Sequence, residues 1–288
     1  MSLKVIVTGA DGQLAQCIKG LYKSHQKAIH FIFVSKDELD ITDQNNLGNY
    51  FKDHSFDYCI NCAAYTNVDG AEDDPETAFL INAEAVGYLA EACQRNKVVL
   101  IHLSTDYVFD GTKNEAYTIH DQPNPINVYG ASKLEGELKI KEHLEKYYII
   151  RASWLYSDHG KNFLKTIIRK LEMNEDLNIV DTQLGSPTSC YELARFIFFI
   201  IISGDLNFGI YHFGTTNSTN WFEFAKRIAS YFPSYDGSRI KGVSNFPSRA
   251  KRPANSVLST KEIESIYDRI DSWENSLDKL MKKMLSKQ

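Results

Sequence analysis

Hydrophobic residues follow a repeating order over the first 153 residues of the chain. Five short runs are apolar almost throughout and predict buried β-strands: "KVIVTGA" (4–10), "IHFIFVS" (29–35), "FDYCINCAA" (56–64), "VVLIHLST" (98–105) and "YYIIRAS" (147–153). Between them, apolar residues recur at helical spacing, which predicts helices over 12–25, 43–54 and 75–96 and a helix containing Tyr129. Strands that are buried on both faces and alternate with helices form parallel sheets. This order predicts an α/β fold with a Rossmann-type doubly wound parallel sheet.

The pattern loosens after residue 153. Helical spacing recurs over 162–174, 191–203, 220–232, 260–270 and 272–287, strand-like runs begin at 177 and at 209, and 235–256 is expected to be a polar loop region. We interpret this half as a smaller mixed α/β lobe that binds substrate. The expected domains are a Rossmann domain over 1–153, rejoined by segments near 177–215, and an interleaved substrate-binding lobe over 154–288.

Composition narrows the class of protein. The chain has 288 residues, of which 43% are hydrophobic and 24% charged, with a formal net charge of -5. The chain has no excess of basic residues, so we do not expect a nucleic-acid partner. The longest apolar run, "FIFFIII" (196–202), is too short for a bilayer, which needs about 20 residues, and is interpreted as a buried helix segment. The N-terminus lacks a signal-peptide pattern, so we expect a cytoplasmic protein without a membrane partner.

The five cysteines do not suggest a disulfide framework, because they are scattered and odd in number. Cys59 and Cys62 form a C-x-x-C pair inside a predicted strand. No second cysteine or histidine pair follows at zinc spacing, so we interpret these two thiols as structural.

A glycine turn follows the first predicted strand. "VTGADGQLAQ" places Gly9 and Gly12 between that strand and the first helix, which opens with Gln13 and Leu14. Glycines let the backbone turn tightly and approach a ligand, and the free N–H groups of a helix N-terminus attract a pyrophosphate. In this context the turn predicts a dinucleotide site.

The end of the second strand bears on the choice of cofactor. A carboxylate there would bind a ribose 2′-hydroxyl and select NAD. The sequence has Ser35 and Lys36, and a hydroxyl with a cation suits a 2′-phosphate better. We therefore expect NADPH, with NADH as the alternative. Asp40 and Ile41 could line the adenine pocket.

Two further strands end in small or polar residues. In a doubly wound sheet, ligands bind beyond the carboxyl ends of the strands. The third strand ends with Ala63, Ala64, Tyr65 and Thr66, and the fourth ends with Ser104, Thr105, Asp106 and Tyr107. We expect all of them on the ligand side, where small alanines would let the cofactor lie against the backbone.

Tyr129 and Lys133 are four residues apart on a predicted helix, so their side chains share one face. A tyrosine has a pKa of about 10, and a neighbouring ammonium is expected to lower it. Such a phenol could protonate a carbonyl oxygen as hydride reaches its carbon. Thr105 could hydrogen-bond the same oxygen. The predicted catalytic residues are thus Thr105, Tyr129 and Lys133.

At this point the chain resembles the dTDP-4-dehydrorhamnose reductase family of the extended short-chain dehydrogenase/reductase superfamily. The resemblance is carried, in order, by "GADGQL", "NCAAYTNVDGAE", "STDYVFDGT", "NVYGASKLEGE", "RASWLY", "GKNF", "LGSPTS" and "RPANSVL". It implies NADPH- or NADH-dependent reduction of the C4 ketone of dTDP-6-deoxy-L-lyxo-4-hexulose to dTDP-L-rhamnose, a step in polysaccharide biosynthesis.

The resemblance also implies roles for individual residues. It assigns catalysis to Thr105, Tyr129 and Lys133, with Lys133 also touching the cofactor. Its other cofactor contacts are Gly12, Gln13, Leu14, Asp40, Ile41, Ala64, Tyr65 and Thr66. On the substrate side it implies Ser104, Thr105 and Trp154, with Asn162, Pro187, Arg252 and Ser256 as further candidates. From the residues alone, Trp154 offers an apolar face, Arg252 suits a diphosphate, and Asn162 could cap the helix that follows it.

Three other interpretations remain open at this stage. A dehydratase or epimerase of the same fold is disfavoured because Asp106 is followed by Tyr107, where dehydratases usually carry a second acid. Another nucleotide-sugar ketoreductase is also compatible. A non-catalytic NADP-binding subunit, like the regulatory subunit of methionine adenosyltransferase, shares the fold. Some family members bind Mg²⁺ at a dimer contact, so the resemblance is compatible with a homodimer and with Mg²⁺, but no carboxylate cluster in this sequence assigns a metal.

Overall fold

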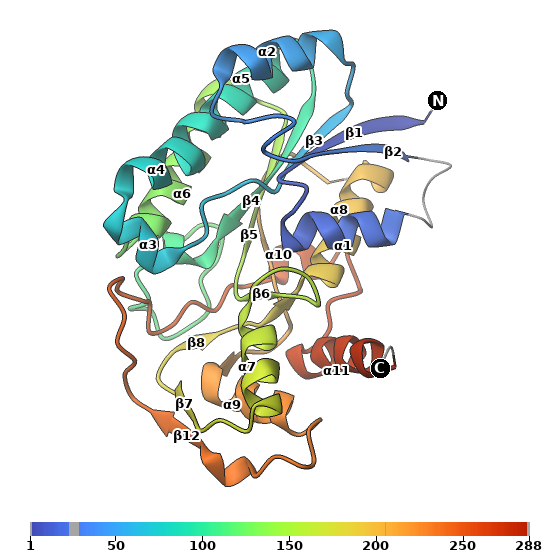
Figure 1. Ribbon diagram of the computed structural model, residues 1–288. Coiled ribbons are helices and arrows are strands. Elements are labelled where there is room, and N and C mark those ends of the chain that lie inside the picture. The colour runs from blue at the N-terminus through green and yellow to red at the C-terminus, as the bar shows by residue number, and fades with distance from the viewer. Residues whose placement is uncertain (1, 23–28, 205, 287–288) are drawn as a thin grey trace.

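A computed structural model describes residues 2–22, 29–204 and 206–286 (Figure 1). Two predicted helices extend beyond these residues. The end of the helix expected over 12–25 and the last residue of the one expected over 272–287 lie outside the described part of the chain.

The main sheet has six parallel strands. Their spatial order is β2 (Ile29–Val34), β1 (Leu3–Thr8), β3 (Tyr58–Asn61), β4 (Val99–Thr105), β5 (Tyr147–Ala152) and β10 (Gly209–Phe213). The chain goes from β1 to β2 on one side, then crosses to β3 on the other. The gap between the ends of β1 and β3 is therefore the switch point where such sheets bind ligands. The predicted doubly wound fold is confirmed.

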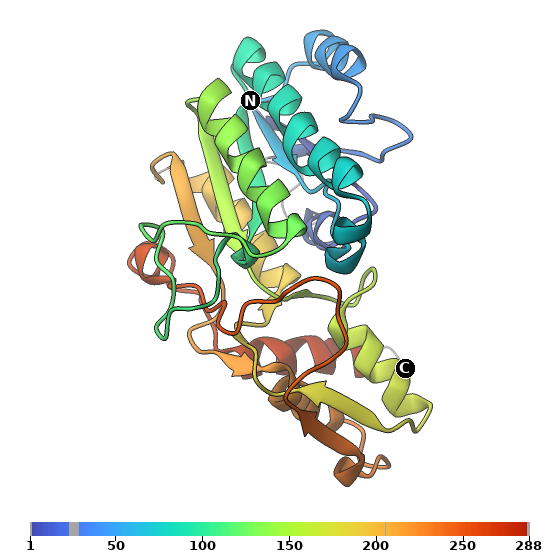
Figure 2. The same ribbon diagram turned by 90° about the vertical axis from the view of Figure 1, so that its left-hand side faces the viewer.

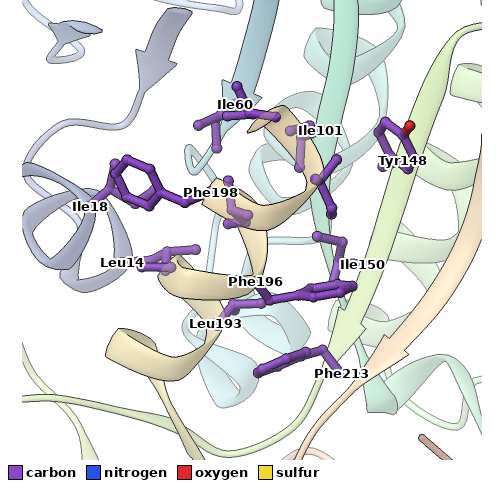
Figure 3. Packing of buried hydrophobic residues seen from close by; sticks show 14 of the residues in the cluster. Leu14, Ile18, Ile60, Ile101, Tyr148, Ile150, Leu193, Phe196, Phe198 and Phe213 are labelled. Atoms are coloured by element: carbon purple, nitrogen blue, oxygen red, sulfur yellow. The ribbon is translucent and has the colours of Figure 1, made fainter. Parts of the chain in front are cut away.

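Helices cover both faces of this sheet (Figures 1 and 2). On one face lie α1 (Gln13–Tyr22) and α8 (Cys190–Ser203), and on the other lie α2 (Gln44–Asp53), α5 (Ala85–Asn96) and α6 (Val128–His143). Figure 3 shows Leu14 and Ile18 of α1 and Phe196 of α8 packed over the strands. The apolar run 196–202 lies within α8, as predicted, and most of its residues are buried. Among the described residues, no helix has the length and apolar character that crossing a membrane requires.

The helix predicted over 75–96 is three consecutive segments. It consists of α4 (Pro75–Phe79), a π-helical turn (Leu80–Glu84) and α5, and it is preceded by a short α3 (Val68–Asp73) that the pattern did not predict. π-helical turns inside helices often mark functional sites, because the extra residue redirects a side chain.

A smaller lobe lies below the sheet domain in Figure 1. Its core is formed by α7 (Phe163–Glu172), α9 (Trp221–Ala229) and α11 (Trp273–Leu285) with the parallel pair β7 (Leu177–Val180) and β12 (Ile240–Val243). Two-residue strands pair as β6 (Leu155–Tyr156) with β9 (Thr188–Ser189) and β8 (Leu184–Gly185) with β11 (Thr219–Asn220).

Two details of this half differ from the prediction. The polar region 235–256 contains β12, whose Ile240 is buried against the lobe core although its neighbours are polar. The helix expected over 260–270 is the single turn α10 (Lys261–Glu264). The chain returns to the main sheet with α8 and β10, whereas β7 pairs within the lobe.

Candidate active site

The carboxyl ends of β1 and β3 meet at the glycine turn. Gly9 has a φ of +65°, and a Cβ on it would lie 2.7 Å from the Ala63 backbone nitrogen. The Gly12 N–H donates to the Gly9 carbonyl at 2.9 Å and closes the turn. Ala63 and Ala64 are half-buried, and Thr66 is exposed at the same edge. Only glycine satisfies both the positive φ and this close approach of the two strand ends.

α1 begins directly after this turn. Leu14 is 5% exposed and packs into the core, so only its backbone can face a ligand. The Gln13 side chain donates to the Leu155 carbonyl at 3.3 Å and accepts from Asn162 Nδ2 at 3.1 Å. Gln13 therefore ties the helix start to the lobe. By helix geometry, the first N–H groups of α1 have no acceptor within the helix, which suits them to an anion.

The turn after β2 contains an acid that the sequence interpretation missed. Glu38 accepts a hydrogen bond from the Ser35 backbone N–H at 2.8 Å. Asp40 accepts from Thr42, while Ile41 is buried. The S-x-x-E spacing of Ser35 and Glu38 is the capping-box pattern, and it could have predicted this contact.

Thr105 and Tyr129 meet at the carboxyl end of β4. Asn127 caps α6 by accepting from the Gly130 N–H at 2.7 Å, which places half-buried Tyr129 in the first helical turn. The Thr105 hydroxyl accepts from the Tyr107 N–H at 3.1 Å and donates to Asp106 Oδ1 at 3.0 Å. It also faces the Tyr129 phenol. Two predicted catalytic residues are therefore side by side.

The pKa of Tyr129 differs from the expectation. Burial raises the pKa of this phenol to about 12, and the nearby Asp106 carboxylate adds to the rise, against a lowering by the Thr105 hydrogen bond. Lys133 Nζ donates to the Leu103 carbonyl at 2.6 Å and lies 3.3 Å from His102 Nε2. The predicted lowering of the Tyr129 pKa by Lys133 is wrong, because the ammonium is directed at β4.

A buried ion pair supports the end of β4. Ser104 donates to Glu137 Oε1 at 2.5 Å, and Glu137 also accepts from Arg151 at 2.6 and 2.9 Å. Arg151 and Glu137 are 1% and 0% exposed. The sequence interpretation missed both, although a charged residue inside the apolar run "YYIIRAS" was a signal for a buried partner.

Asn82, in the π-helical turn, is another residue that the sequence interpretation missed. It is fully buried, and its side chain accepts from the Tyr65 N–H at 2.9 Å and donates to the Tyr65 carbonyl at 3.0 Å. The same amide donates to Ser132 Oγ of α6 at 3.0 Å. Asn82 thus fixes the strand-end backbone relative to α6. A polar residue within the apolar stretch "FLINAEAV" was its only signal.

Trp154 lies between β5 and β6 with a φ of +48°, which is rare for a residue with a side chain. Its ring stacks on Trp221 with centroids 3.5 Å apart and planes at 9°. Trp221 also lines a pocket of about 530 Å³ together with Phe163, Gln183, Phe246 and Arg252. The sequence interpretation missed Trp221. Non-glycine residues with positive φ often mark binding sites, because surrounding contacts must hold them there.

Arg252 is paired within the protein. Its Nη2 donates to Asp69 at 3.0 Å, and Asp69 also accepts from Ser248 Oγ at 2.7 Å and the Ala250 N–H at 3.1 Å. Residues 244–252, which we call the strap, are thereby held against α3.

The other substrate-side candidates are engaged in the lobe. Asn162 accepts from the Lys165 N–H at 3.0 Å, so its predicted capping of α7 is confirmed. Pro187 is buried between β8 and β9. Ser256 is buried, its N–H donates to the Leu184 carbonyl at 2.8 Å, and its hydroxyl faces Asp106.

One group of potential metal ligands occurs among the described residues. Ligand atoms of Cys17, Asp158 and His159 lie within 4.8 Å of one another. Lys283 Nζ is 3.3 Å from Asp158 Oδ2 and already supplies a positive charge there. We assign no metal to this group.

Comparisons with known proteins show the family of this chain. The family model described as "RmlD substrate binding domain" matches residues 3–286. A dTDP-4-dehydrorhamnose reductase from Sinorhizobium fredii is 36% identical, with 97% of each chain covered, and one from Burkholderia thailandensis is 34% identical, with 99% of this chain and all of that one covered.

The structure is similar to a crystal structure of dTDP-4-dehydrorhamnose reductase from Bacillus anthracis in complex with NADP. The TM-score is 0.93 at 36% identity, over 98% of this chain and 100% of the other. The resemblance found in the motifs is confirmed over the length of the chain. The protein therefore belongs to the RmlD substrate binding domain family, together with these dTDP-4-dehydrorhamnose reductases.

Proposed function

We propose that this protein reduces the C4 ketone of dTDP-6-deoxy-L-lyxo-4-hexulose with NADPH to give dTDP-L-rhamnose. The observation that carries the proposal is the pair of facing hydroxyls, Thr105 and Tyr129, at the carboxyl edge of the sheet beside the glycine turn. The names of the full-length relatives support the same reaction.

The residues at the switch point suit a dinucleotide. The Gly9–Gly12 turn and the first N–H groups of α1 would hold its pyrophosphate. When bound, NADPH supplies the hydride. The NADP complex of the similar crystal structure favours NADPH over NADH, as does exposed Lys36 near the end of β2. The remaining proposed cofactor contacts are Gln13, Leu14, Ser35, Asp40, Ile41, Ala63, Ala64, Tyr65, Thr66, Tyr129 and Lys133.

Tyr129 is the proposed proton donor to the ketone oxygen. With a pKa of about 12, Tyr129 stays protonated at neutral pH. As hydride reaches the carbonyl carbon, the ketone oxygen gains negative charge and becomes basic enough to take the phenol proton. The Thr105 hydroxyl would turn from Asp106 to stabilise the same oxygen.

The pocket beside Trp154 is the proposed site for the nucleotide part of the substrate. The stacked Trp154 and Trp221 rings would contact an apolar face of the sugar or base. Arg252 lines the same pocket and would exchange Asp69 for the diphosphate. Ser104, Asn162, Pro187 and Ser256 remain proposed substrate contacts.

The test is oxidation of NADPH by the purified chain with freshly prepared dTDP-6-deoxy-L-lyxo-4-hexulose, with NADH in parallel. We expect ketosugar-dependent loss of NADPH absorbance. Tyr129→Phe should lower kcat about 10²–10⁴-fold and leave NADPH affinity unchanged. The control is Tyr211→Phe. It removes a hydroxyl that donates to the Asn207 carbonyl on the edge strand β10. Full activity of Tyr129→Phe would refute its role. A chain that binds NADPH but oxidises none would favour the binding-subunit interpretation.

A further inference from the structure

Four buried polar side chains form a hydrogen-bonded row from β1 to α6. Thr8 Oγ1 donates to Asn61 Oδ1 at 2.7 Å, Asn61 Nδ2 lies 3.1 Å from His102 Nδ1, and His102 Nε2 lies 3.3 Å from Lys133 Nζ. Thr8, Asn61, His102 and Lys133 are between 0 and 2% exposed. The row crosses β1, β3 and β4 and ends at a proposed catalytic residue.

The orientation of the Asn61 amide is fixed by the backbone. The Ala63 N–H donates to Asn61 Oδ1 at 3.2 Å, and a backbone N–H cannot accept a hydrogen bond. The opposite orientation would direct the amide NH₂ at this N–H. Asn61 Nδ2 is therefore the donor toward His102 Nδ1.

This donor fixes the position of the proton on His102. Burial, with Lys133 as a second cause, holds the pKa of His102 well below 6.5, so the imidazole is neutral at physiological pH. A neutral imidazole has one protonated nitrogen. Because Nδ1 accepts from Asn61, the proton lies on Nε2, the atom that faces Lys133 Nζ. An amine can accept that proton in a hydrogen bond, whereas an ammonium cannot.

We propose that His102, oriented by Asn61, is a positioning residue that favours the neutral amine of Lys133 and thereby sets the pH at which Lys133 loses its proton. The amine would accept from His102 Nε2 and donate to the Leu103 carbonyl, which satisfies both known contacts. An ammonium would keep the contact with Leu103 and meet a second donor at His102.

The other influences on the Lys133 pKa have opposite signs. Burial is the main cause that lowers the Lys133 pKa to about 8, and the Glu137 carboxylate on the same helix opposes it. Glu137 is already paired with Arg151 and Ser104. Burial raises the pKa of the Cys62 thiol on the β3 side, so this group is neutral, as is Tyr129 one turn before Lys133. The N–H of His102 is thus the neighbouring dipole that opposes the ammonium.

The direct test is the titration of Lys133, followed by NMR of the chain labelled with ¹³C at lysine Cε and assigned with Lys133→Met. We expect a midpoint near 8 in the parent protein. His102→Gln should raise it by about one pH unit or more, because the Gln oxygen can accept from the ammonium. An unchanged midpoint would overturn the proposal.

The matched control is His212→Gln. His212 on β10 is 1% exposed and contacts the Tyr117 carbonyl rather than Lys133. His212→Gln should leave the Lys133 titration midpoint unchanged. A shift equal to that in His102→Gln would show a general effect of removing a buried histidine. ¹⁵N NMR of histidine-labelled parent protein tests the tautomer without any variant. An unprotonated Nδ1 on His102 supports the proposal, and a protonated Nδ1 overturns it.

The catalytic consequence rests on the proposed function, whereas the titration does not. If Lys133 acts as an ammonium, the reductase rate should fall above its midpoint, and His102→Gln should move this alkaline limb upward by the same amount. A lower rate with an unmoved limb would indicate a purely structural role. A chain without reductase activity would still give the titration result.

Discussion

Asp106 lies beside the phenol of Tyr129 with 3% of its surface exposed. Burial is the main cause that raises its pKa to about 6, against hydrogen bonds from Ser256 and Thr105 that lower it. A carboxylate whose pKa is raised by burial destabilises the fold when it ionises, and such groups are concentrated at functional sites.

The first prediction concerns Asp106→Asn. The folded pKa is about 6 against an ordinary value of 3.8, so the native state binds more protons between these pH values and stability falls as pH rises through them. The amide avoids the buried charge. At pH 8 it should raise the free energy of unfolding by about 2 to 3 kcal/mol. Urea denaturation at pH 8 and pH 5 should show this gain shrinking at the lower pH.

Asp110→Asn is the control of opposite sign. Hydrogen bonds from Thr112, Asn124 and Tyr117 hold the pKa of Asp110 below its usual range. Its replacement should destabilise the protein at pH 8. A gain in both variants would show that removing a negative charge, rather than burial, explains the result.

Among the elements, α6 depends on close approach at two glycines. A Cβ on Gly130 would lie 2.1 Å from the Tyr107 carbonyl oxygen, and one on Gly136 would lie 2.1 Å from the Asn82 carbonyl oxygen of the π-helical turn. Because both partners are backbone atoms, neither can rotate away. These contacts set how closely α6 approaches the end of β4 and the π-helical turn.

Gly136→Ala should therefore displace α6. We expect a loss of about 1 to 3 kcal/mol in stability, as for overpacked cores, together with a lower kcat. Gly48→Ala in α2 is the matched control, since a Cβ there meets nothing within 4 Å. It should stabilise by about 0.5 to 1 kcal/mol through helix propensity. Thermal unfolding of both variants measures the difference, and equal effects would contradict this account of α6.

Three contacts of the strap converge on one carboxylate, that of Asp69. Asp69 of α3 accepts from Ser248, Ala250 and Arg252. Asp73 of the same helix forms an ion pair with Arg249. Asp69→Asn should release the strap, because the amide loses the charge and one acceptor.

Limited trypsin digestion followed by mass spectrometry measures this release. Cleavage after Arg249, Lys251 or Arg252 should accelerate several-fold in Asp69→Asn and little in Asp73→Asn. Unchanged cleavage in Asp69→Asn would mean that other contacts hold the strap. Under the proposed function, the same variant should alter KM for the ketosugar more than kcat, because Arg252 lines the nucleotide pocket.

For the whole molecule, buried histidines make stability sensitive to acid. Burial, followed by the Arg151 charge, lowers the pKa of His212 to about 3, against an ordinary value of 6.5. Between these values the unfolded chain binds a proton that the native state does not. Stability therefore falls as pH falls through this window, by about 1.4 kcal/mol per pH unit for each such histidine.

His212→Gln should reduce this dependence. Between pH 6 and pH 4, the slope of unfolding free energy against pH should become shallower by about 1.4 kcal/mol per unit. Chemical denaturation across this range gives the slope. Replacing exposed His54, which has no comparable burial, should leave the slope unaltered. If the His212 variant kept the parent slope, the histidine would not be neutral in the native state.

Much of the fold could be predicted because its signals are local. The five strands of the first half are short apolar runs. The glycine turn could be predicted because Gly9 and Gly12 lie directly between a strand pattern and a helix pattern. The two-residue strands β6, β8, β9 and β11 have no periodicity to detect. β12 was missed because only the lobe core explains the burial of Ile240.

The sequence by itself determined the parallel sheet and the glycine turn, and it predicted Thr105, Tyr129 and Lys133 as the reacting groups. These depend on periodicity, glycine conformation and i, i+4 spacing, which are properties of neighbouring residues. The tertiary structure alone decided that Lys133 is directed at Leu103 and His102, that Trp154 stacks on Trp221, and that Arg252 pairs with Asp69. Such contacts join distant segments, and the burial that shifts their pKa values arises only when the layers pack.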